Sequence, residues 1–326
     1  MKKILSILVV LTMVLSALVL SGCGAKAEEV KLGLGVSSSV SATDATEDKA
    51  GQGQATFTVA AVLVDGEGKV VKAVIDCADN KVGFTAEGKA VSNDTFTTKY
   101  EAGTNYNMVA YGGAKLEWFE QADVFCNVIV GKTASEIKAL VAADAKGTEE
   151  VLNAGCTIYV SDFVKAVEKA IANATVAGAT ADDALKLGVA TTQTVADATE
   201  DKNGSNKVAT NFFAAAVDAE GKVVAASTDC AEVTFTFDVK GVSTFDASQE
   251  VLTKKEKGTN YNMVAYGGAK LEWFEQAAAF DATCVGKTVA EIEGMMLDTN
   301  YGGEELQTAG CTILVDGFIK AVSKIG

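Results

Sequence analysis

The sequence predicts an α+β fold in two tandem homologous domains, each an antiparallel β-sheet or hairpins packed with helices. The first observation is composition: 326 residues, 48% of them hydrophobic and 22% charged, are typical of a globular chain of about two domains. The second is a duplication, because residues 103–122 (GTNYNMVAYGGAKLEWFEQA) recur unchanged at 258–277. The third is order: in each copy strand-like segments precede helix-like ones, which indicates α+β rather than a doubly wound parallel sheet.

The first elements of a copy have the pattern of β-strands. Residues 31–40 predict a first strand. Residues 57–65 and 69–77 are apolar and rich in β-branched side chains, and a Gly-Glu-Gly turn joins them, so we expect a hairpin. Residues 155–160 predict a last short strand.

Helical periodicity follows the strands. Residues 114–125 place Trp118, Phe119 and their apolar neighbours on one helical face, which predicts a core-facing helix. Thr133 and Thr288 each begin a capping box, so a helix should start at both. We expect Ser161 to cap a final amphipathic helix, whose apolar face would comprise Phe163, Ala166, Val167, Ala170 and Ile171.

The duplication also sets the domain boundaries that we expect. An offset of 155 residues relates the two long copies, and it also relates the Ala-Gly-Cys-Thr at 154–157 to the same four residues at 309–312. We place the domains at 29–174 and 184–326. The join, 175–183, is small and polar and lacks apolar periodicity, so we expect a linker there.

The N-terminus has the pattern of a secretion signal. A basic start precedes an apolar run over residues 4–20, which ends in Leu-Ser-Gly-Cys. This end resembles the lipobox of bacterial lipoproteins, which implies removal of residues 1–22 and lipidation of Cys23, with 23–28 as a tether. We therefore expect an extracytoplasmic protein that is lipid-anchored to the outer face of a bacterial membrane. A short transmembrane anchor is the alternative.

Charge and missing residue types exclude several functions. The formal net charge is -15, every basic residue is Lys, and the chain has neither His nor Pro. Without His there is no His-based catalytic triad and no His metal ligand. An acidic chain without Arg also argues against a nucleic-acid partner, because phosphate contacts need a basic surface.

The recurrent Ala-Gly-Cys-Thr, placed just before a predicted helix, resembles the Ser-Gly-Ala-Thr motif of the bacterial FMN-binding domain family. That family includes flavinylated surface lipoproteins of extracellular electron transfer. The order of hairpin, helices, motif and amphipathic helix is also similar, over nearly the whole mature chain and twice. Gly155 and Thr157, with Gly310 and Thr312, match the motif. Ala and Cys stand where the family has Ser and Ala, so we interpret the chain as two tandem degenerate copies.

The resemblance implies FMN as cofactor, attached to Thr157 and Thr312 through a phosphodiester bond that a separate flavin transferase makes. Gly155 and Gly310 would let another backbone approach the acceptor closely. The residues alone also fit a simpler interpretation, in which Thr157 is an ordinary strand threonine and Gly155 a bend.

The duplicated block supplies side chains that are able to stack on an isoalloxazine ring. Trp118 and Phe119 are expected in the core instead, because they lie on the buried helical face. The candidates for flavin contact precede the helix; they are Tyr106, Met108 and Tyr111 in the first copy and Tyr261, Met263 and Tyr266 in the second.

Six cysteines remain beside Cys23, and their spacing does not resemble a zinc site, so we expect no metal. Cys77 alternates onto the apolar face of its strand, which predicts a buried thiol. The alternative, open to a protein outside the cytoplasm, is one disulfide per domain, Cys77 with Cys156 and Cys230 with Cys311. We expect Glu117 and Glu120 on a solvated helix face.

These observations lead us to expect a membrane-anchored surface lipoprotein that binds FMN and carries electrons. It would not be a stand-alone enzyme, because the flavin does the redox chemistry and the protein positions it. The expected partners are the membrane, a flavin transferase and redox proteins. The alternatives are a cofactor-free structural or binding surface lipoprotein with the same fold and, third, a solute-binding lipoprotein of a transporter.

Overall fold

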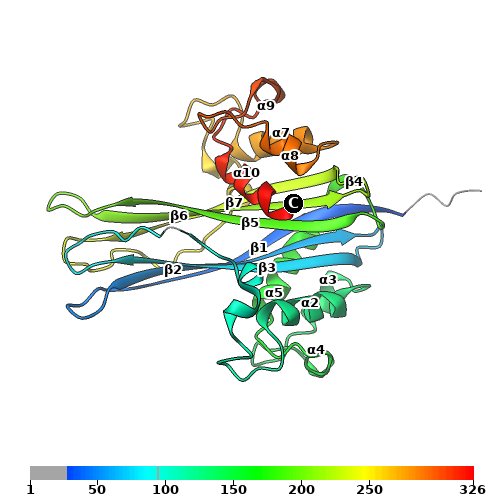
Figure 1. The fold of residues 1–326 in the computed structure, drawn as a ribbon, viewed down its shortest axis with the longest axis horizontal. Coiled ribbons are helices and arrows are strands. Elements are labelled where there is room, and N and C mark those ends of the chain that lie inside the picture. The colour runs from blue at the N-terminus through cyan, green and yellow to red at the C-terminus, as the bar shows by residue number, and fades with distance from the viewer. Residues whose placement is uncertain (1–27, 94) are drawn as a thin grey trace, which may run out of the picture.

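The computed structural model describes residues 28–93 and 95–326, so the predicted signal peptide and Cys23 lie outside the described residues. Figure 1 shows four layers: two sheets stacked face to face in the middle, with one group of helices on the outer side of each sheet. Below, the first half means residues 28–180 and the second half residues 184–326. The predicted α+β class is confirmed.

In the first half, three long strands come first: β1 (Glu29–Thr43), β2 (Gly51–Val64) and β3 (Val70–Phe84). Five helices, the 3₁₀ turn η1 and a short strand follow; they are α1 (Lys99–Ala102), η1 (Gly103–Tyr106), α2 (Trp118–Ile129), α3 (Ala134–Lys138), α4 (Glu149–Ala154), α5 (Ser161–Ala172) and β4 (Val176–Thr180). The sheet order is β3-β2-β1-β4, with every neighbouring pair antiparallel.

The second half repeats this order. Its sheet is β5-β6-β7, made of β5 (Ala184–Ala196), β6 (Gly204–Val217) and β7 (Val223–Phe237). The helices and 3₁₀ turns that follow are α6 (Lys254–Lys257), η2 (Gly258–Tyr261), α7 (Trp273–Cys284), α8 (Val289–Glu293), α9 (Glu304–Ala309), α10 (Asp316–Val322) and η3 (Ser323–Ile325).

Both faces of the central strands are buried, which explains their nearly continuous apolar sequence. Side chains alternate between the faces of a strand. In β2, Phe57, Val59 and Leu63 belong to the core between the two sheets, whereas Ala60 and Val62 belong to the core beneath the helices. The sheets therefore bind each other through one shared apolar layer.

Glycines in the strands let the helices lie close to the sheets. A Cβ atom at Gly35 on β1 would come 2.3 Å from the backbone oxygen of Ala166 on α5. The equivalent Gly188 on β5 would come 1.9 Å from the oxygen of Ala321 on α10. Only a residue without a Cβ fits at this approach.

The two halves contact each other reciprocally. The Ala45 amide donates to the Gly241 oxygen (2.8 Å), and its equivalent Ala198 donates to Gly88 (2.8 Å). The equivalent residues Phe84 and Phe237 stack on each other, with ring centroids 4.4 Å apart and an interplanar angle of 5°.

Ion pairs between the two halves are reciprocal as well. Lys169 on α5 pairs with Glu256 on α6 (2.5 Å), and its equivalent Lys324 pairs with Glu101 on α1 (2.5 Å). Each contact thus occurs twice with the roles of the halves exchanged. This is the arrangement of a two-fold symmetric dimer within one chain.

The predicted strands, the core-facing helix and both capping boxes are confirmed, with the strands longer than expected. The predicted strand at 155–160 is wrong, because Gly155 ends α4 and the chain then runs directly into α5. Ser161 is the first residue of α5, and Val160 takes the N-cap position without a side-chain bond, so the predicted Ser161 cap is also wrong. The expected linker 175–183 contains β4, which pairs with β1.

Within the described part of the chain, none of the helices is long and apolar enough to cross a membrane. In that same part, no cluster of three or more acidic or cysteine side chains has a geometry suited to a metal ion.

Candidate functional site

The Ala-Gly-Cys-Thr motif forms the connection from α4 to α5. Gly155 ends α4 with a left-handed φ of +117°, Cys156 is fully buried, and Thr157 is exposed. In the second half, Gly310 ends α9 with a φ of +108° and Thr312 is again exposed. Both predicted acceptor threonines therefore present their side chains to solvent.

A buried glutamine holds each of these threonines. Gln121 on α2 accepts from the Thr157 amide (2.8 Å) and from Thr157 Oγ1 (3.1 Å), while its own Nε2 donates to the Leu116 oxygen (3.0 Å). Gln276 makes the same pair of bonds with Thr312, both at 2.9 Å. The duplicated block contains both glutamines, so block and motif, distant in sequence, meet in each half.

This arrangement orients a hydroxyl but does not activate it. An amide oxygen accepts a hydrogen bond and cannot take up the proton at neutral pH. A serine or threonine nucleophile needs an adjacent base. Gln121 and Gln276 therefore hold the two hydroxyls in place without supplying a base.

The motif glycines have a conformational role of their own. A φ of +117° at Gly155 belongs to a left-handed helix C-cap, which favours glycine. A Cβ atom there would also come 3.3 Å from Leu116 Cδ1. The glycine is thus explained by the end of α4 without any ligand.

The candidate aromatic and methionine side chains make other contacts. Lys99 Nζ lies 5.4 Å from the centre of the Tyr106 ring, and the partly buried Met108 side chain packs against the core beneath the helices of the first half. In the second half, Tyr261 takes the same position against Lys254 (5.1 Å), and Met263 packs partly buried beside α7. Tyr111 and Tyr266 are 89% and 88% exposed. None of these contacts joins these side chains to Thr157 or Thr312.

The expectation that Glu117 lies on a solvated helix face is wrong. Glu117 is 5% exposed rather than solvated, and its carboxylate accepts from the amides of Met108 and Val109 (2.8 and 3.2 Å). Glu120 closes a capping box by accepting from the Glu117 amide (2.8 Å). Both carboxylates therefore organise the loop before α2, and the same bonds recur at Glu272.

The six cysteines within the described residues are free and buried, so the disulfide alternative is wrong and the buried-thiol prediction is confirmed. The Thr58 hydroxyl on the neighbouring strand donates a hydrogen bond to Cys77 Sγ (3.8 Å), whereas Cys156 packs in the same core cluster as Cys126. Burial raises the pKa of the Cys77 and Cys156 thiols to about 11. These groups stay protonated and poorly nucleophilic at neutral pH.

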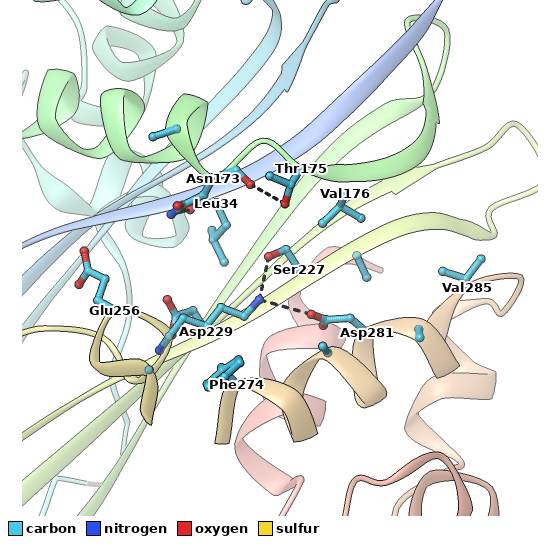
Figure 2. A pocket seen from close by; sticks show the side chains of 16 residues that line it. Leu34, Asn173, Thr175, Val176, Ser227, Asp229, Glu256, Phe274, Asp281 and Val285 are labelled. Carbon is cyan, nitrogen blue, oxygen red and sulfur yellow. Dashed lines mark hydrogen bonds and ion pairs between the residues drawn. The ribbon is translucent and has the colours of Figure 1, made fainter. Parts of the chain in front are cut away.

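A cavity of about 630 Å³ opens between the two halves (Figure 2). One wall consists of β1, the end of α5 and β4, and the other of β7, α6 and α7. On the second wall, Lys255 Nζ donates to Ser227 Oγ (3.1 Å) and to Asp281 (3.5 Å). Asp281 also accepts from the Thr228 amide (3.0 Å).

Sequence reasoning missed this cavity, because none of its polar residues belongs to a motif. The sequence signal that could have indicated the cavity is a difference between the two copies. Where the second half has Ser227, Lys255 and Asp281, the first half has Val74, Tyr100 and Cys126. Three polar positions on facing elements thus lack a counterpart in the first copy.

No family model, no curated protein and no solved structure matches the chain. The resemblance to the FMN-binding domain family therefore rests on the sequence motif and the element order alone.

Proposed function

We propose that the protein is a surface lipoprotein, anchored through Cys23, whose two domains carry FMN on Thr157 and Thr312 and transfer electrons. The observation that supports this proposal most directly is the repeated Gln–Thr pair. In both halves an exposed threonine has its hydroxyl held by a buried glutamine of the identical block. Identical presentation at two degenerate motifs fits a modifying enzyme that recognises the same surface twice.

In this proposal the chain only presents the threonine hydroxyl to the transferase. In the modification, a bond forms between threonine Oγ1 and the flavin phosphorus as a phosphoanhydride bond of an activated flavin donor breaks, and the other phosphate half of that donor leaves with the bonding electron pair. The hydroxyl proton passes to a base of the transferase. Bound flavin would then supply the electron chemistry, and the protein would position it.

The test is co-expression with a bacterial flavin transferase, followed by intact mass and visible spectrum. We expect one FMN mass per modified half. Thr157→Val should remove the modification of the first half, and Thr312→Val that of the second. Thr43→Val, an exposed threonine at the end of β1, is the matched control and should retain both.

Gln121→Leu keeps Thr157 but removes the side chain that holds its hydroxyl, so it tests whether the orientation of Thr157 matters for modification. It should lower modification of the first half only, since Gln276 still holds Thr312. A colourless protein of unmodified mass after co-expression would contradict the proposal. That outcome would favour the cofactor-free surface lipoprotein, with a transporter solute-binding lipoprotein as the third candidate.

The anchor has a separate test. The purified wild type should carry the mass of acyl chains and lack residues 1–22, and Cys23→Ser should lose the acyl mass, because the proposed acyl chains attach to that thiol. A wild type that keeps residues 1–22 and carries no acyl mass would instead indicate that the apolar N-terminal run is a transmembrane anchor.

A further inference from the structure

We propose that the cavity between the halves binds one neutral, largely apolar organic molecule whose oxygen atom accepts hydrogen bonds from Lys255 and Ser227. The volume of about 630 Å³ lies in the range of small-molecule sites, about 300–1,000 Å³. This site is distinct from Thr157 and Thr312, which do not line the cavity. The proposal does not depend on flavin attachment.

The walls are mostly apolar. Leu34 and Val176 line the cavity from the first half, and Phe274 on α7 and Val285 just after it line the cavity from the second half (Figure 2). Ala282 on α7 also lines it. Apolar walls with a few convergent polar groups are typical of organic ligand sites, because the walls supply affinity and the polar groups fix orientation.

The polar groups gather at one place on β7, α6 and α7. An ammonium has three N–H donors, and those of Lys255 have two acceptors in the protein, Ser227 Oγ (3.1 Å) and Asp281 (3.5 Å). One N–H remains. Because Ser227 Oγ accepts from Lys255, its hydroxyl hydrogen is also left to donate. Two donors are thus available for an oxygen of a ligand.

Each charged side chain at this place already has a partner in the protein, either an opposite charge or backbone amides, which favours a neutral ligand. Lys255 lies against Asp281, and Glu256 pairs with Lys169 of the first half (2.5 Å). The Asp229 carboxylate accepts from the amides of Cys230 and Lys255 (2.7 and 3.1 Å). An ionic ligand would leave its own charge unpaired in a mostly apolar space, which is costly.

The first half shows how the same place is filled when these residues are absent. Tyr100, equivalent to Lys255, packs edge-on against Phe119 (5.9 Å between ring centroids) and donates to Asp123 (3.2 Å). The residues equivalent to Phe119 and Asp123 are Phe274 and Ala278, which line the cavity. In the second half, lysine and alanine replace the tyrosine and the aspartate. The space that the Tyr100 ring fills in the first half is therefore open in the second half, as part of the cavity.

The test uses 6-propionyl-2-dimethylaminonaphthalene, a neutral aromatic ketone whose fluorescence reports on polarity and on hydrogen bonds to its carbonyl. Titrated into the purified protein, it should bind saturably with one site per chain and a blue-shifted emission. Lys255→Met should weaken binding about 10- to 150-fold, since a hydrogen bond from a charged donor is worth about 1.5–3 kcal/mol. The anionic probe 8-anilinonaphthalene-1-sulfonate should bind at least tenfold more weakly than the ketone.

Two further variants test the location. Ala278→Phe should block the cavity, and Lys255→Tyr should fill it with a ring at the position that Tyr100 takes in the first half; both should abolish saturable binding. Asp123→Phe, the equivalent position in the first half, is the matched control and should leave the dissociation constant within twofold. Far-UV circular dichroism and the melting temperature would identify variants that fail to fold, and only folded variants enter the comparison.

The proposal is overturned if the folded wild type binds the ketone without saturation, or if Ala278→Phe binds it as well as the wild type does. Tighter binding of the anionic probe would overturn the assigned ligand class.

Discussion

The stacked pair Phe84–Phe237 predicts that the two halves unfold as coupled units. Both rings are fully buried, and each also covers a glycine of the neighbouring strand: a Cβ at Gly51 would come 2.2 Å from the Phe84 ring, and one at Gly204 would come 2.4 Å from the Phe237 ring. We consider Phe84→Leu, Phe237→Leu and the double variant. Leucine keeps much of the apolar volume and removes the aromatic contact.

The magnitude follows from two contributions. The change of shape costs about 1–1.5 kcal/mol at each site. The stacking is worth about 0.5–1.5 kcal/mol beyond area burial. Each single variant loses the stacking energy, whereas the double variant loses it once. The destabilisation of the double variant should therefore fall short of the sum of the singles by about 0.5–1.5 kcal/mol.

The assay is urea unfolding at equilibrium, followed by tryptophan fluorescence and far-UV circular dichroism. The chain has one tryptophan in each half, Trp118 and Trp273, so fluorescence reports on both. The matched control is Phe125→Leu with Phe280→Leu, equivalent buried residues that lie under separate helix layers. Additivity of the Phe84 and Phe237 variants within about 0.3 kcal/mol would refute coupling through this stack.

Three further predictions concern packing, protonation and thiol reactivity. Gly188→Ala should destabilise the protein by about 1–3 kcal/mol, because its Cβ would overlap the Ala321 oxygen, while Gly66→Ala, with open space around it, should stay within about 0.5 kcal/mol in the same urea assay. Burial raises the pKa of Asp229 to about 6, so the folded chain holds this proton more tightly than the unfolded chain does. The stability contribution of Asp229 therefore falls as pH rises from about 4 to about 6, and Asp229→Asn should flatten the melting temperature over that interval; an unchanged slope would contradict the raised pKa. The six buried thiols should react with a disulfide reagent only after unfolding, and fast reaction of any of them in the native protein would contradict their burial.

The sequence predicted the elements whose signal is local or repeated. The strand pattern of residues 57–77 and the capping boxes at Thr133 and Thr288 were enough to locate a hairpin and two helix starts. It failed at residues 155–160, where an apolar run next to a glycine indicated a strand. The positive φ of Gly155 depends on α4, a helix of six residues whose periodicity is too short to recognise.

The candidate site was predicted in part. The motif threonines and the duplicated block could be found by comparing the copies, but their contact through Gln121 could not, because it depends on how α2 packs over the α4–α5 connection. Glu117 was placed wrongly for a related reason: helical periodicity does not show that a loop folds back and buries the first carboxylate. The cavity depends on the packing of the two sheets, to which no local pattern corresponds.

The reciprocal contacts between the halves have a consequence for mass action. Two separate chains with this interface would come apart on dilution, whereas halves joined through α5 and β4 meet at an effective concentration on the order of millimolar whatever the concentration of the protein. Covalent joining also removes the constraint that every substitution appears on both sides of the axis. A symmetric dimer that replaced Tyr100 by lysine would do so twice; this chain carries lysine at 255 and retains tyrosine at 100, so the two sides of one interface can take different roles.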